Sequence, residues 1–392
     1  MCPPGPGRIA CPFPFHVTVK PAGAACNLRC TYCHYLEKRA LFPASGGMRM
    51  SAEVLDRFTR EYIRAQPEGV DEVCFAWQGG EPTLCGLDFF QSAVEAQKRH
   101  ARAGMAIQNA LQTNGVLIND DWAAFLARER FLVGLSLDGP ENLHDLRRVD
   151  AEGRGTFRCA MRGLEALRKK KAEVNALTVI HRENGDFPEL IYRFLREAGF
   201  RHMQFIPLVA GGGSGSGRSV EPAQYGRFLA AVFDLWLRRD VGRVFVRSFD
   251  AALAAVLGYP SSQCVTAETC GRTAVLEHNG DLFPCDFFVT REDRLGNLAE
   301  TALADLICDP RLMRFGKRKR DALPPRCLAC EYLELCRGGC PAHRTAESPD
   351  SLCEGYRLFY GHAMEPLAAM ARAIRHGQEA RDYSRFLQKK PG

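Results

Sequence analysis

Three cysteines near the start of the chain have a spacing suited to an iron–sulfur cluster. Cys26, Cys30 and Cys33 are separated by three and then two residues. Three thiolates can hold three irons of a four-iron cluster, which leaves the fourth iron able to bind another molecule. A zinc loop completed by His34 is the alternative. We favour the cluster because the loop follows a predicted strand, and β/α barrels carry their active sites at the carboxyl ends of strands.

A second group of cysteines lies in the last third of the chain. Its eight members are Cys264, Cys270, Cys285, Cys327, Cys330, Cys336, Cys340 and Cys353. Eight thiolates are what two fully ligated four-iron clusters require. Two tetrahedral zinc sites would use similar spacings, so spacing alone leaves both possibilities open.

Other polar residues stand where they could contact a ligand. Gly79 and Gly80 would let the backbone approach a ligand closely, and Glu81 offers a carboxylate to an ammonium group. Asp286 directly follows a cysteine and is a candidate general base if it is partly desolvated. A structural turn and a capping aspartate are the respective alternatives.

The elements that must position these residues alternate between short apolar strands and amphipathic helices. The predicted strands are 15–20, 72–77, 106–112, 131–136, 174–180 and 202–206. The predicted helices between them are 52–65, 87–103, 121–128, 157–170 and 187–198. This alternation predicts a parallel sheet with right-handed crossovers. Six β/α units are fewer than the eight of a closed barrel, so we expect an α/β fold with a partial (β/α)6 TIM-like barrel.

Local signals set the expected ends of these helices. Ser51 is a good N-cap, and Gly104 and Gly199 are good C-caps. Further helices are expected at 223–237 and 361–375. The glycine- and serine-rich stretch 211–217 predicts a flexible loop or linker.

Composition excludes several classes of protein. The net charge is +6, and the basic run at 317–320 is interpreted as a solvated helix end, so nucleic-acid binding is not expected. No apolar run is long enough to span a membrane, and the first residues do not form a signal peptide. Seventeen cysteines without an export signal indicate metal ligands in a reducing cytoplasm. The six scattered ones, namely Cys2, Cys11, Cys74, Cys85, Cys159 and Cys308, are expected to be mostly packing residues.

The first cysteine motif, together with the glycine-rich motif after the second strand, resembles the radical S-adenosylmethionine superfamily. In that family the open iron chelates S-adenosylmethionine, whose cleavage yields a 5'-deoxyadenosyl radical. The resemblance implies that Gly80 and Glu81 meet the amino group of the methionine. It also implies that Ser136 holds the ribose and that Arg148 clamps the carboxylate with paired hydrogen bonds, a surface arginine being the alternative. Tyr32 and Val209 would contact the adenine. The implied cofactor-binding set is Tyr32, Gly80, Glu81, Ser136, Arg148 and Val209.

The second cysteine group resembles the SPASM extension of that superfamily, which carries two auxiliary four-iron clusters. The resemblance implies that one cluster is held by Cys264, Cys270, Cys285 and Cys340. The other is then held by Cys327, Cys330, Cys336 and Cys353. The implied domains are the partial barrel at 1–235, the cluster domain at 236–362 and a helical tail at 363–392.

Nearly the whole chain is similar to the anaerobic sulfatase-maturating enzymes. The segments that carry this resemblance are 20–22, 33–36, 77–83, 136–140 and 284–289. It implies oxidation of a cysteine or serine of an unfolded or nascent sulfatase to Cα-formylglycine. The radical would take a hydrogen from the side-chain Cβ, Asp286 would take the thiol or hydroxyl proton, and an auxiliary cluster would accept the remaining electron. A flavodoxin or ferredoxin would supply the reducing electron.

Two other functions stay open at this point. One is a SPASM-type enzyme that forms thioether or carbon–carbon crosslinks in peptides. An N-terminal peptide-binding winged-helix domain would favour it, but only about 14 residues precede the first predicted strand. The other is a non-enzymatic iron–sulfur or zinc protein, against which the open three-cysteine motif argues.

Overall fold

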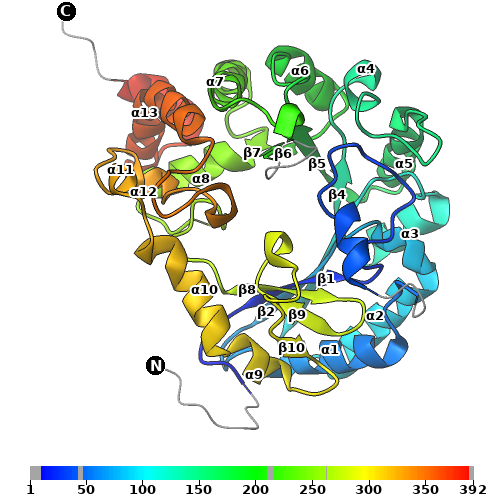
Figure 1. Ribbon diagram of the computed structural model, residues 1–392. Coiled ribbons are helices and arrows are strands. Elements are labelled where there is room, and N and C mark those ends of the chain that lie inside the picture. The colour runs from blue at the N-terminus through cyan, green and yellow to red at the C-terminus, as the bar shows by residue number, and fades with distance from the viewer. Residues whose placement is uncertain (1–9, 43–46, 210–215, 262, 388–392) are drawn as a thin grey trace, which may run out of the picture. The chain divides into compact units, whose positions relative to one another are not determined.

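The computed structural model describes residues 10–42, 47–209, 216–261 and 263–387, and the chain divides into two compact units (Figure 1). The first unit comprises residues 1–136, 145–174 and 270–317. The second comprises 137–144, 175–269 and 318–392. Most of the glycine- and serine-rich stretch at 211–217 lies outside the described residues.

The first unit is built on a mostly parallel sheet with the strand order β10-β9-β8-β1-β2-β3-β4. The strands are β1 (His16–Lys20), β2 (Glu72–Trp77), β3 (Ala106–Thr113), β4 (Leu132–Ser136), β8 (Thr273–Glu277), β9 (Asp281–Phe283) and β10 (Gly296–Asn297). Pairing is parallel from β8 through β1, β2 and β3 to β4, and antiparallel between β8, β9 and β10. The carboxyl ends of β8, β1, β2, β3 and β4 therefore lie along one edge of the sheet.

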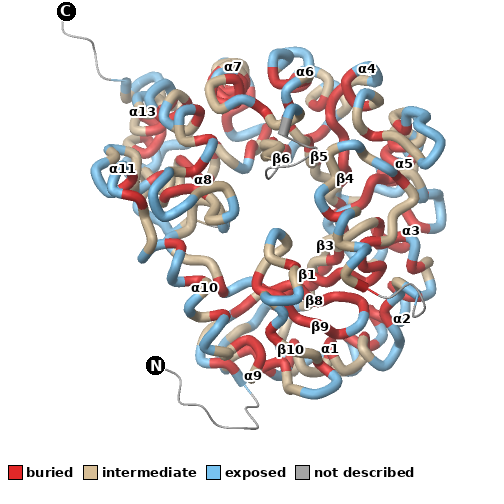
Figure 2. The backbone as a smooth tube through the Cα atoms, viewed as in Figure 1, coloured by how far each residue is buried: buried red, intermediate tan, exposed pale blue. Residues whose placement is uncertain are grey.

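Helices cover one face of this sheet (Figure 1). They are α1 (Ala52–Ala65), α2 (Gly86–His100), α3 (Asp120–Arg128) and α5 (Phe157–Lys169), with α9 (Leu303–Ile307) later in the chain. The next helix, α10 (Pro310–Asp321), begins in the first unit and ends in the second. Between helices and strands lies a network of aromatic rings in which Phe75 stacks on Trp77 and Trp77 meets Phe90 edge-on. Figure 2 shows the strands as the most buried part of this unit.

The second unit combines three parallel strands with a helical region. The strands are β5 (Glu173–Ile180), β6 (His202–Pro207) and β7 (Phe245–Val246). The helices are α4 (Glu141–His144), α6 (Pro188–Glu197), α7 (Pro222–Arg239), α8 (Arg247–Val256), α11 (Pro325–Leu328), α12 (Leu333–Cys336) and α13 (Cys353–Arg375). Helices α7 and α13 cross closely: a Cβ on Gly226 would lie 2.6 Å from the carbonyl oxygen of Gly355. Only glycine permits that approach.

All six predicted strands are present, within one residue of their predicted ends. Ser51 caps α1 as predicted, because its side chain accepts a hydrogen bond from the Val54 N–H at 3.2 Å. Gly199 adopts φ +77° directly after the cap residue of α6. These three predictions were correct because each depends on residues that are close together in the sequence.

Three predictions were wrong. Gly104 does not cap α2, which ends at His100 because Arg102 turns away to donate hydrogen bonds to backbone carbonyls at Gln66 and Pro67. The last helix begins at Cys353 rather than residue 361, since its packing on α7 outweighs the glycines in its first turns. The basic run at 317–320 is not solvated throughout, because Lys319 is fully buried.

The predicted domain boundaries at 235 and 362 remain predictions. Both fall inside helices, α7 and α13 respectively. In the described part of the chain, no helix combines the length and apolar character required to cross a bilayer.

Candidate functional site

The loop that carries Cys26, Cys30 and Cys33 is shaped by its own unit's backbone. The N–H of Arg29 donates to the carbonyl of Val149 at 2.7 Å, and the N–H of Thr31 donates to the carbonyl of Arg147 at 2.9 Å. The segment after β4 thus holds the cysteine loop from one side. All three thiols are half-buried, so they are held in place and still accessible to a ligand.

Cys26 is the most constrained of the three thiols. Its sulfur accepts a hydrogen bond from the Leu28 N–H at 3.3 Å and lies 3.9 Å from the Asn114 side-chain nitrogen. Burial raises the pKa of Cys26 to about 12, although the Leu28 hydrogen bond acts in the opposite direction. A metal would therefore displace a proton from this thiol on binding.

The two glycines after β2 bring that strand end against the start of the cysteine loop. The N–H of Gly80 donates to the carbonyl of Gly23, and that of Glu81 to the carbonyl of Ala25, both at 2.8 Å. A Cβ on Gly80 would overlap the Ala25 carbonyl, and Gly79 has φ +135°. The backbone that packs closely against these two glycines is therefore the segment directly before Cys26, and not a ligand.

The carboxylate of Glu81 is fully buried and joins β2 to β3. Its Oε1 accepts hydrogen bonds from the Thr83 N–H, the Thr83 hydroxyl and the Thr113 hydroxyl, and its Oε2 accepts one from the Asn114 N–H at 2.8 Å. Burial raises the pKa of Glu81 and these hydrogen bonds oppose the shift. Oε1 is saturated by its three donors, which leaves Oε2 as the oxygen able to meet a ligand ammonium.

Asn114 extends this network to the cysteines. Its side-chain nitrogen donates to the Asn27 side-chain oxygen at 2.8 Å, and its own oxygen accepts from the Val116 N–H at 3.0 Å. The ends of β2 and β3 and the cysteine loop are thereby connected by one chain of hydrogen bonds.

Three further residues of the predicted cofactor set belong to the first unit. The Arg148 guanidinium lies over the Tyr32 ring, 5.6 Å from its centroid, and is largely buried. Ser136 is buried at the end of β4, beside the end of β3, since Thr113 pairs with Leu135. The structure therefore brings Tyr32 and Arg148 together, as a cation–π pair.

Asp286 stands on a short 3-10 turn after β9 and pairs with a buried lysine. The distance from Lys20 Nζ to Asp286 Oδ1 is 2.6 Å, and the two side chains are 2% and 30% exposed. Gln78 donates weakly to the other oxygen, Oδ2, at 3.5 Å. Because Oδ1 is buried against the ammonium, Oδ2 is the oxygen through which Asp286 can accept a proton.

Sheet register builds the surroundings of this ion pair. Lys20 pairs with Glu277 across β1 and β8, and Glu277 accepts a hydrogen bond from the hydroxyl of Tyr35. The Lys20 ammonium also lies 4.4 Å from the centre of the Tyr35 ring. Burial, followed by the neighbouring carboxylates, raises the pKa of Tyr35, so its hydroxyl stays protonated.

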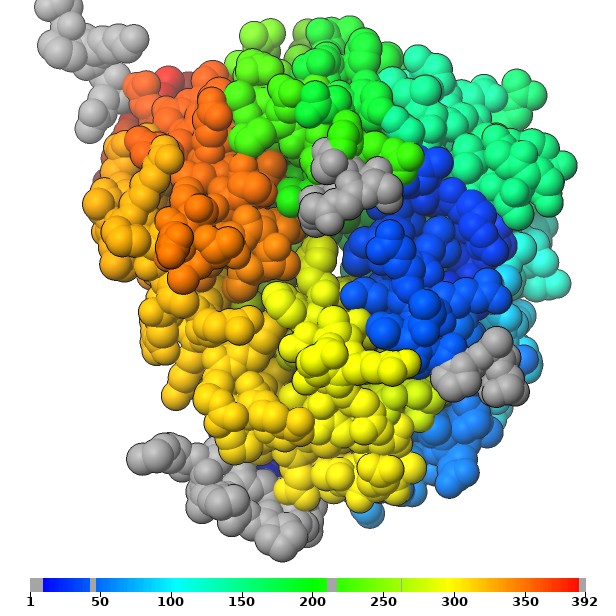
Figure 3. All heavy atoms as spheres, in the orientation of Figure 1, coloured from blue at the N-terminus to red at the C-terminus, as the bar shows by residue number. Residues whose placement is uncertain are grey.

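A ring stack joins this group to the cysteine loop. His34, which follows Cys33, stacks on Phe287, which follows Asp286, with 5.2 Å between ring centres. In Figure 3 the N-terminal segment (blue) and the segment around residues 273–300 (yellow) adjoin on the face shown. Asp286 and the three-cysteine loop therefore belong to one site of the first unit.

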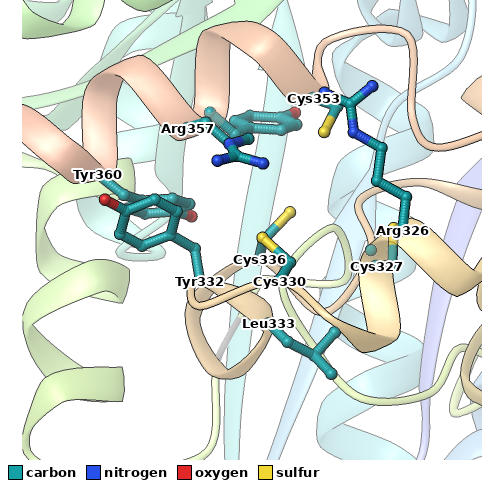
Figure 4. Close-up of a pocket in the computed structure, with 11 residues that line it drawn as sticks. Arg326, Cys327, Cys330, Tyr332, Leu333, Cys336, Cys353, Arg357 and Tyr360 are labelled. Atoms are coloured by element: carbon teal, nitrogen blue, oxygen red, sulfur yellow. The ribbon is translucent and has the colours of Figure 1, made fainter.

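The second unit contains a pocket lined by four of the predicted cluster ligands. Cys327, Cys330, Cys336 and Cys353 surround a space of about 370 Å³ (Figure 4). Tyr332 and Tyr360 lie on one side of it, Tyr356 also lines it, and Arg326 and Arg357 point toward it. Burial raises the pKa of Cys336 to about 12, and Arg326 and Arg357 partly offset the same effect at Cys353.

This donor set has the number of thiolates that a cluster needs. The four cysteines that line one pocket are as many as a fully ligated four-iron cluster requires.

The other predicted site residues are distributed between the units. Cys270 and Cys285 belong to the first unit, whereas Cys264, Cys340 and Val209 belong to the second. Val209 is half-buried two residues after β6, and the Cys340 N–H donates to the Asp350 carboxylate at 2.8 Å.

Several residues of the site escaped the sequence analysis. Lys20, Gln78 and Glu277 were not singled out, and neither was the hairpin β8–β9 that places Asp286. The hairpin has a usable signal, since Asn279 and Gly280 are a typical turn pair between two apolar runs. Lys20 also has a recognisable signal in the sequence, because it is a charged residue at the end of an apolar, buried strand.

The α/β architecture with an open three-cysteine loop after its first strand defines a radical enzyme that uses S-adenosylmethionine. Residues 21–195 match the family model of the Radical SAM superfamily, and residues 264–331 match that of an iron-sulfur cluster-binding domain.

Similar proteins show to which family within this superfamily the chain belongs. A serine-type anaerobic sulfatase-maturating enzyme of Klebsiella aerogenes is 39% identical over 93% of this chain and 88% of that protein. A cysteine-type enzyme of Clostridium perfringens is 36% identical over 92% of this chain and 100% of that protein. The chain belongs to the anaerobic sulfatase-maturating enzymes.

A solved structure described as native anSMEcpe with bound AdoMet supports the same conclusion. It superposes with a TM-score of 0.84 at 35% identity, covering 92% of this chain and 100% of that one. Another structure of the same protein contains the Cp18Cys peptide and has a TM-score of 0.83. The predicted fold, a partial barrel with a SPASM extension, is thereby confirmed.

Proposed function

We propose that this protein oxidises a cysteine or serine side chain of a sulfatase polypeptide to Cα-formylglycine. The observation that carries the proposal is the Lys20–Asp286 pair beside the three-cysteine loop, with a separation of 2.6 Å. Side-chain oxidation of this kind needs a base next to a radical source, and the first unit contains candidates for both.

The chain's residues fit the cofactors that this reaction needs. Cys26, Cys30 and Cys33 would hold the first four-iron cluster, and Gly80, Glu81, Ser136, Arg148, Tyr32 and Val209 would contact S-adenosylmethionine. Cys327, Cys330, Cys336 and Cys353 would hold one auxiliary cluster, and the other four cysteines of the tail are assigned to a second. When bound, these groups supply a 5'-deoxyadenosyl radical and an acceptor for one electron.

Asp286 would act as the general base. Oδ1 is fixed by the Lys20 ammonium, so the proton of the substrate thiol or hydroxyl would be received on Oδ2. The ion pair with Lys20 would hold the carboxylate in place beside the three-cysteine loop. Gln78 would orient Oδ2 through its side-chain amide.

Partners and location follow from the same proposal. The substrate would be an unfolded or nascent sulfatase, since the side chain must reach a base that is 30% exposed. A flavodoxin or ferredoxin would supply the reducing electron. The enzyme would work in the cytoplasm, where thiols remain reduced until clusters are assembled.

The test is anaerobic incubation of the reconstituted protein with S-adenosylmethionine, a reductant and a peptide containing Cys-x-Pro-x-Arg, alongside the serine version. We expect 5'-deoxyadenosine and a peptide mass change matching conversion of the side chain to an aldehyde. A crosslinked peptide would support the alternative radical chemistry. Cofactor cleavage without any change to either peptide would contradict the proposal.

A further inference from the structure

Glu277 is a buried carboxylate that takes no part in the proton transfer proposed above. It ends β8 and has no exposed surface. Its Oε1 accepts a hydrogen bond from the hydroxyl of Tyr35, which is also buried. Its Oε2 has no hydrogen-bond partner among the described residues and lies 3.5 Å from Nδ1 of His278, the next residue in the chain. A buried carboxylate oxygen without a hydrogen bond is costly, so Glu277 calls for an explanation beyond the stability of the sheet.

The lysine opposite Glu277 forms its ion pair with a different carboxylate. Sheet register places Lys20 of β1 opposite Glu277 of β8. The Lys20 ammonium nevertheless pairs with Asp286, at 2.6 Å from Oδ1. A further group must therefore connect Glu277 to this ion pair if the two act together.

Tyr35 is the group that makes this connection. Its hydroxyl donates to Glu277, and the centre of its ring lies 4.4 Å from the Lys20 ammonium. A cation is attracted to the face of an aromatic ring. The ring thus gives the ammonium a second contact besides Asp286, and the hydrogen bond to Glu277 holds the ring in place.

The other oxygen of Glu277 faces a closely packed histidine. The His278 ring meets Phe42 edge-on, with 5.1 Å between the ring centres. Gly23, at φ +52°, leaves room for this ring, since a Cβ on Gly23 would lie 2.6 Å from Nδ1 of His278. Packing on this side restrains Glu277 in the position from which it accepts the Tyr35 hydroxyl.

We propose that Glu277 is a positioning residue for the oxidation of the substrate side chain. It fixes Tyr35, whose ring fixes the Lys20 ammonium. That ammonium in turn fixes Oδ1 of Asp286, so that Oδ2 is presented to the substrate. The inference deepens the proposed function and rests on it, because it takes Asp286 as the base.

The test compares variants of the full, reconstituted chain. Glu277→Leu removes the acceptor of the Tyr35 hydroxyl, whereas Glu277→Gln keeps a carbonyl oxygen in its place. Asp281→Leu is the matched control, because it removes another buried carboxylate of the same hairpin, one that accepts hydrogen bonds from Arg294 and Asn297. The aldehyde formed per 5'-deoxyadenosine is measured at saturating peptide, since this ratio counts only folded enzyme that cleaves the cofactor.

We expect Glu277→Leu to lower this ratio by about 100-fold, because a small displacement of a catalytic group has an effect of that order. The peptide KM should stay unchanged, since Glu277 is buried. Glu277→Gln should keep most of the ratio and Asp281→Leu all of it. Adding Tyr35→Phe to Glu277→Leu should lower the ratio no further, because both changes break the same hydrogen bond.

Crystal structures of the same variants give a measurement that does not depend on catalysis. The ion pair between Lys20 Nζ and Asp286 Oδ1 should be broken in Glu277→Leu. It should stay near 2.6 Å in Glu277→Gln and in Asp281→Leu.

Two results would overturn the inference. One is an unchanged ratio, or an unchanged ion pair, in Glu277→Leu. The other is an equal loss in Glu277→Leu and Glu277→Gln, which would show that the hydrogen bond to Tyr35 is not the link. By contrast, a wild-type chain that cleaves the cofactor without forming aldehyde would contradict the proposed function, and the ion pair in the variants would still test the role of Glu277.

Discussion

The two cysteine sites are built in opposite ways. In the first unit, the thiols lie on an irregular loop fixed by backbone hydrogen bonds to Arg147 and Val149. In the second unit, three of the four pocket cysteines lie in short helices or at a helix start: Cys327 in α11, Cys336 at the end of α12 and Cys353 at the start of α13.

The residues that surround the two cysteine sites also differ in character. The loop is met by strand ends that carry polar groups able to bind a ligand, such as Glu81 and Asn114. The pocket is lined by tyrosines, of which Tyr360 is buried and Tyr356 half-buried. The three-cysteine site, which is proposed to exchange a small molecule, is thus built from loops. The four-cysteine pocket, which is proposed to keep its cluster permanently, is built mainly from helices.

The largest expected effect separates the two cysteine sites. Cys30→Ala should reduce 5'-deoxyadenosine formation to background, because the proposed radical-generating cluster would lose one of its three ligands. Cys336→Ala should lower the iron content by about four per chain and still permit cofactor cleavage. Chromatographic quantification of 5'-deoxyadenosine checks both; equal loss in the two variants would mean that the sites do not have distinct roles.

Asp286→Asn tests the base within the first site. Product formation should fall by about 10²- to 10⁴-fold while cofactor cleavage continues, since the amide cannot accept the substrate proton. Asp293→Asn, on the loop after the same turn, is the matched control. An unchanged aldehyde yield in Asp286→Asn would remove this residue as the base.

A smaller effect is expected when the cation–π pair of Arg148 and Tyr32, beside the three-cysteine loop, is removed. Arg148→Ala should weaken S-adenosylmethionine binding by about 2- to 30-fold, through loss of the guanidinium that lies over Tyr32. Equilibrium dialysis of the reconstituted enzyme measures this, with the exposed Arg154→Ala as control. If both variants bind equally well, Arg148 is not a cofactor contact.

The smallest effect concerns only the stability of the second unit. Burial raises the pKa of Asp250, in α8, from 3.8 to about 6. The folded state therefore holds this proton more tightly than the unfolded state, so stability falls as pH rises from 4 to 6 and stays lower above that. Asp250→Asn should increase the free energy of unfolding by at most ~3 kcal/mol at pH 8 and by nothing below pH 4.

Denaturant unfolding of the unreconstituted chain at the two pH values checks this, with the exposed Asp186→Asn as control. A gain that persists at pH 4 would mean that the asparagine stabilises α8 by hydrogen bonding rather than by removing a buried charge.

The sequence by itself determined the cysteine spacings, the six β/α strands and the cap at Ser51. These features depend on residues close together in the chain, where periodicity, turn chemistry and ligand spacing act directly. The glycines at 79 and 80 were also recognised as a close-approach motif, although the backbone they admit proved to be that of Ala25.

Only the tertiary structure decided which distant groups meet. Lys20 and Asp286 are brought together by the register of β8 on β1, and the ammonium of Lys319 donates to the carbonyl of Cys264, which lies 55 residues away in the chain. No local pattern encodes such pairings, because the energy of a buried charge depends on partners supplied by remote segments. The three-cysteine motif can therefore be recognised in the sequence, whereas the base proposed to act beside it is placed only by the fold.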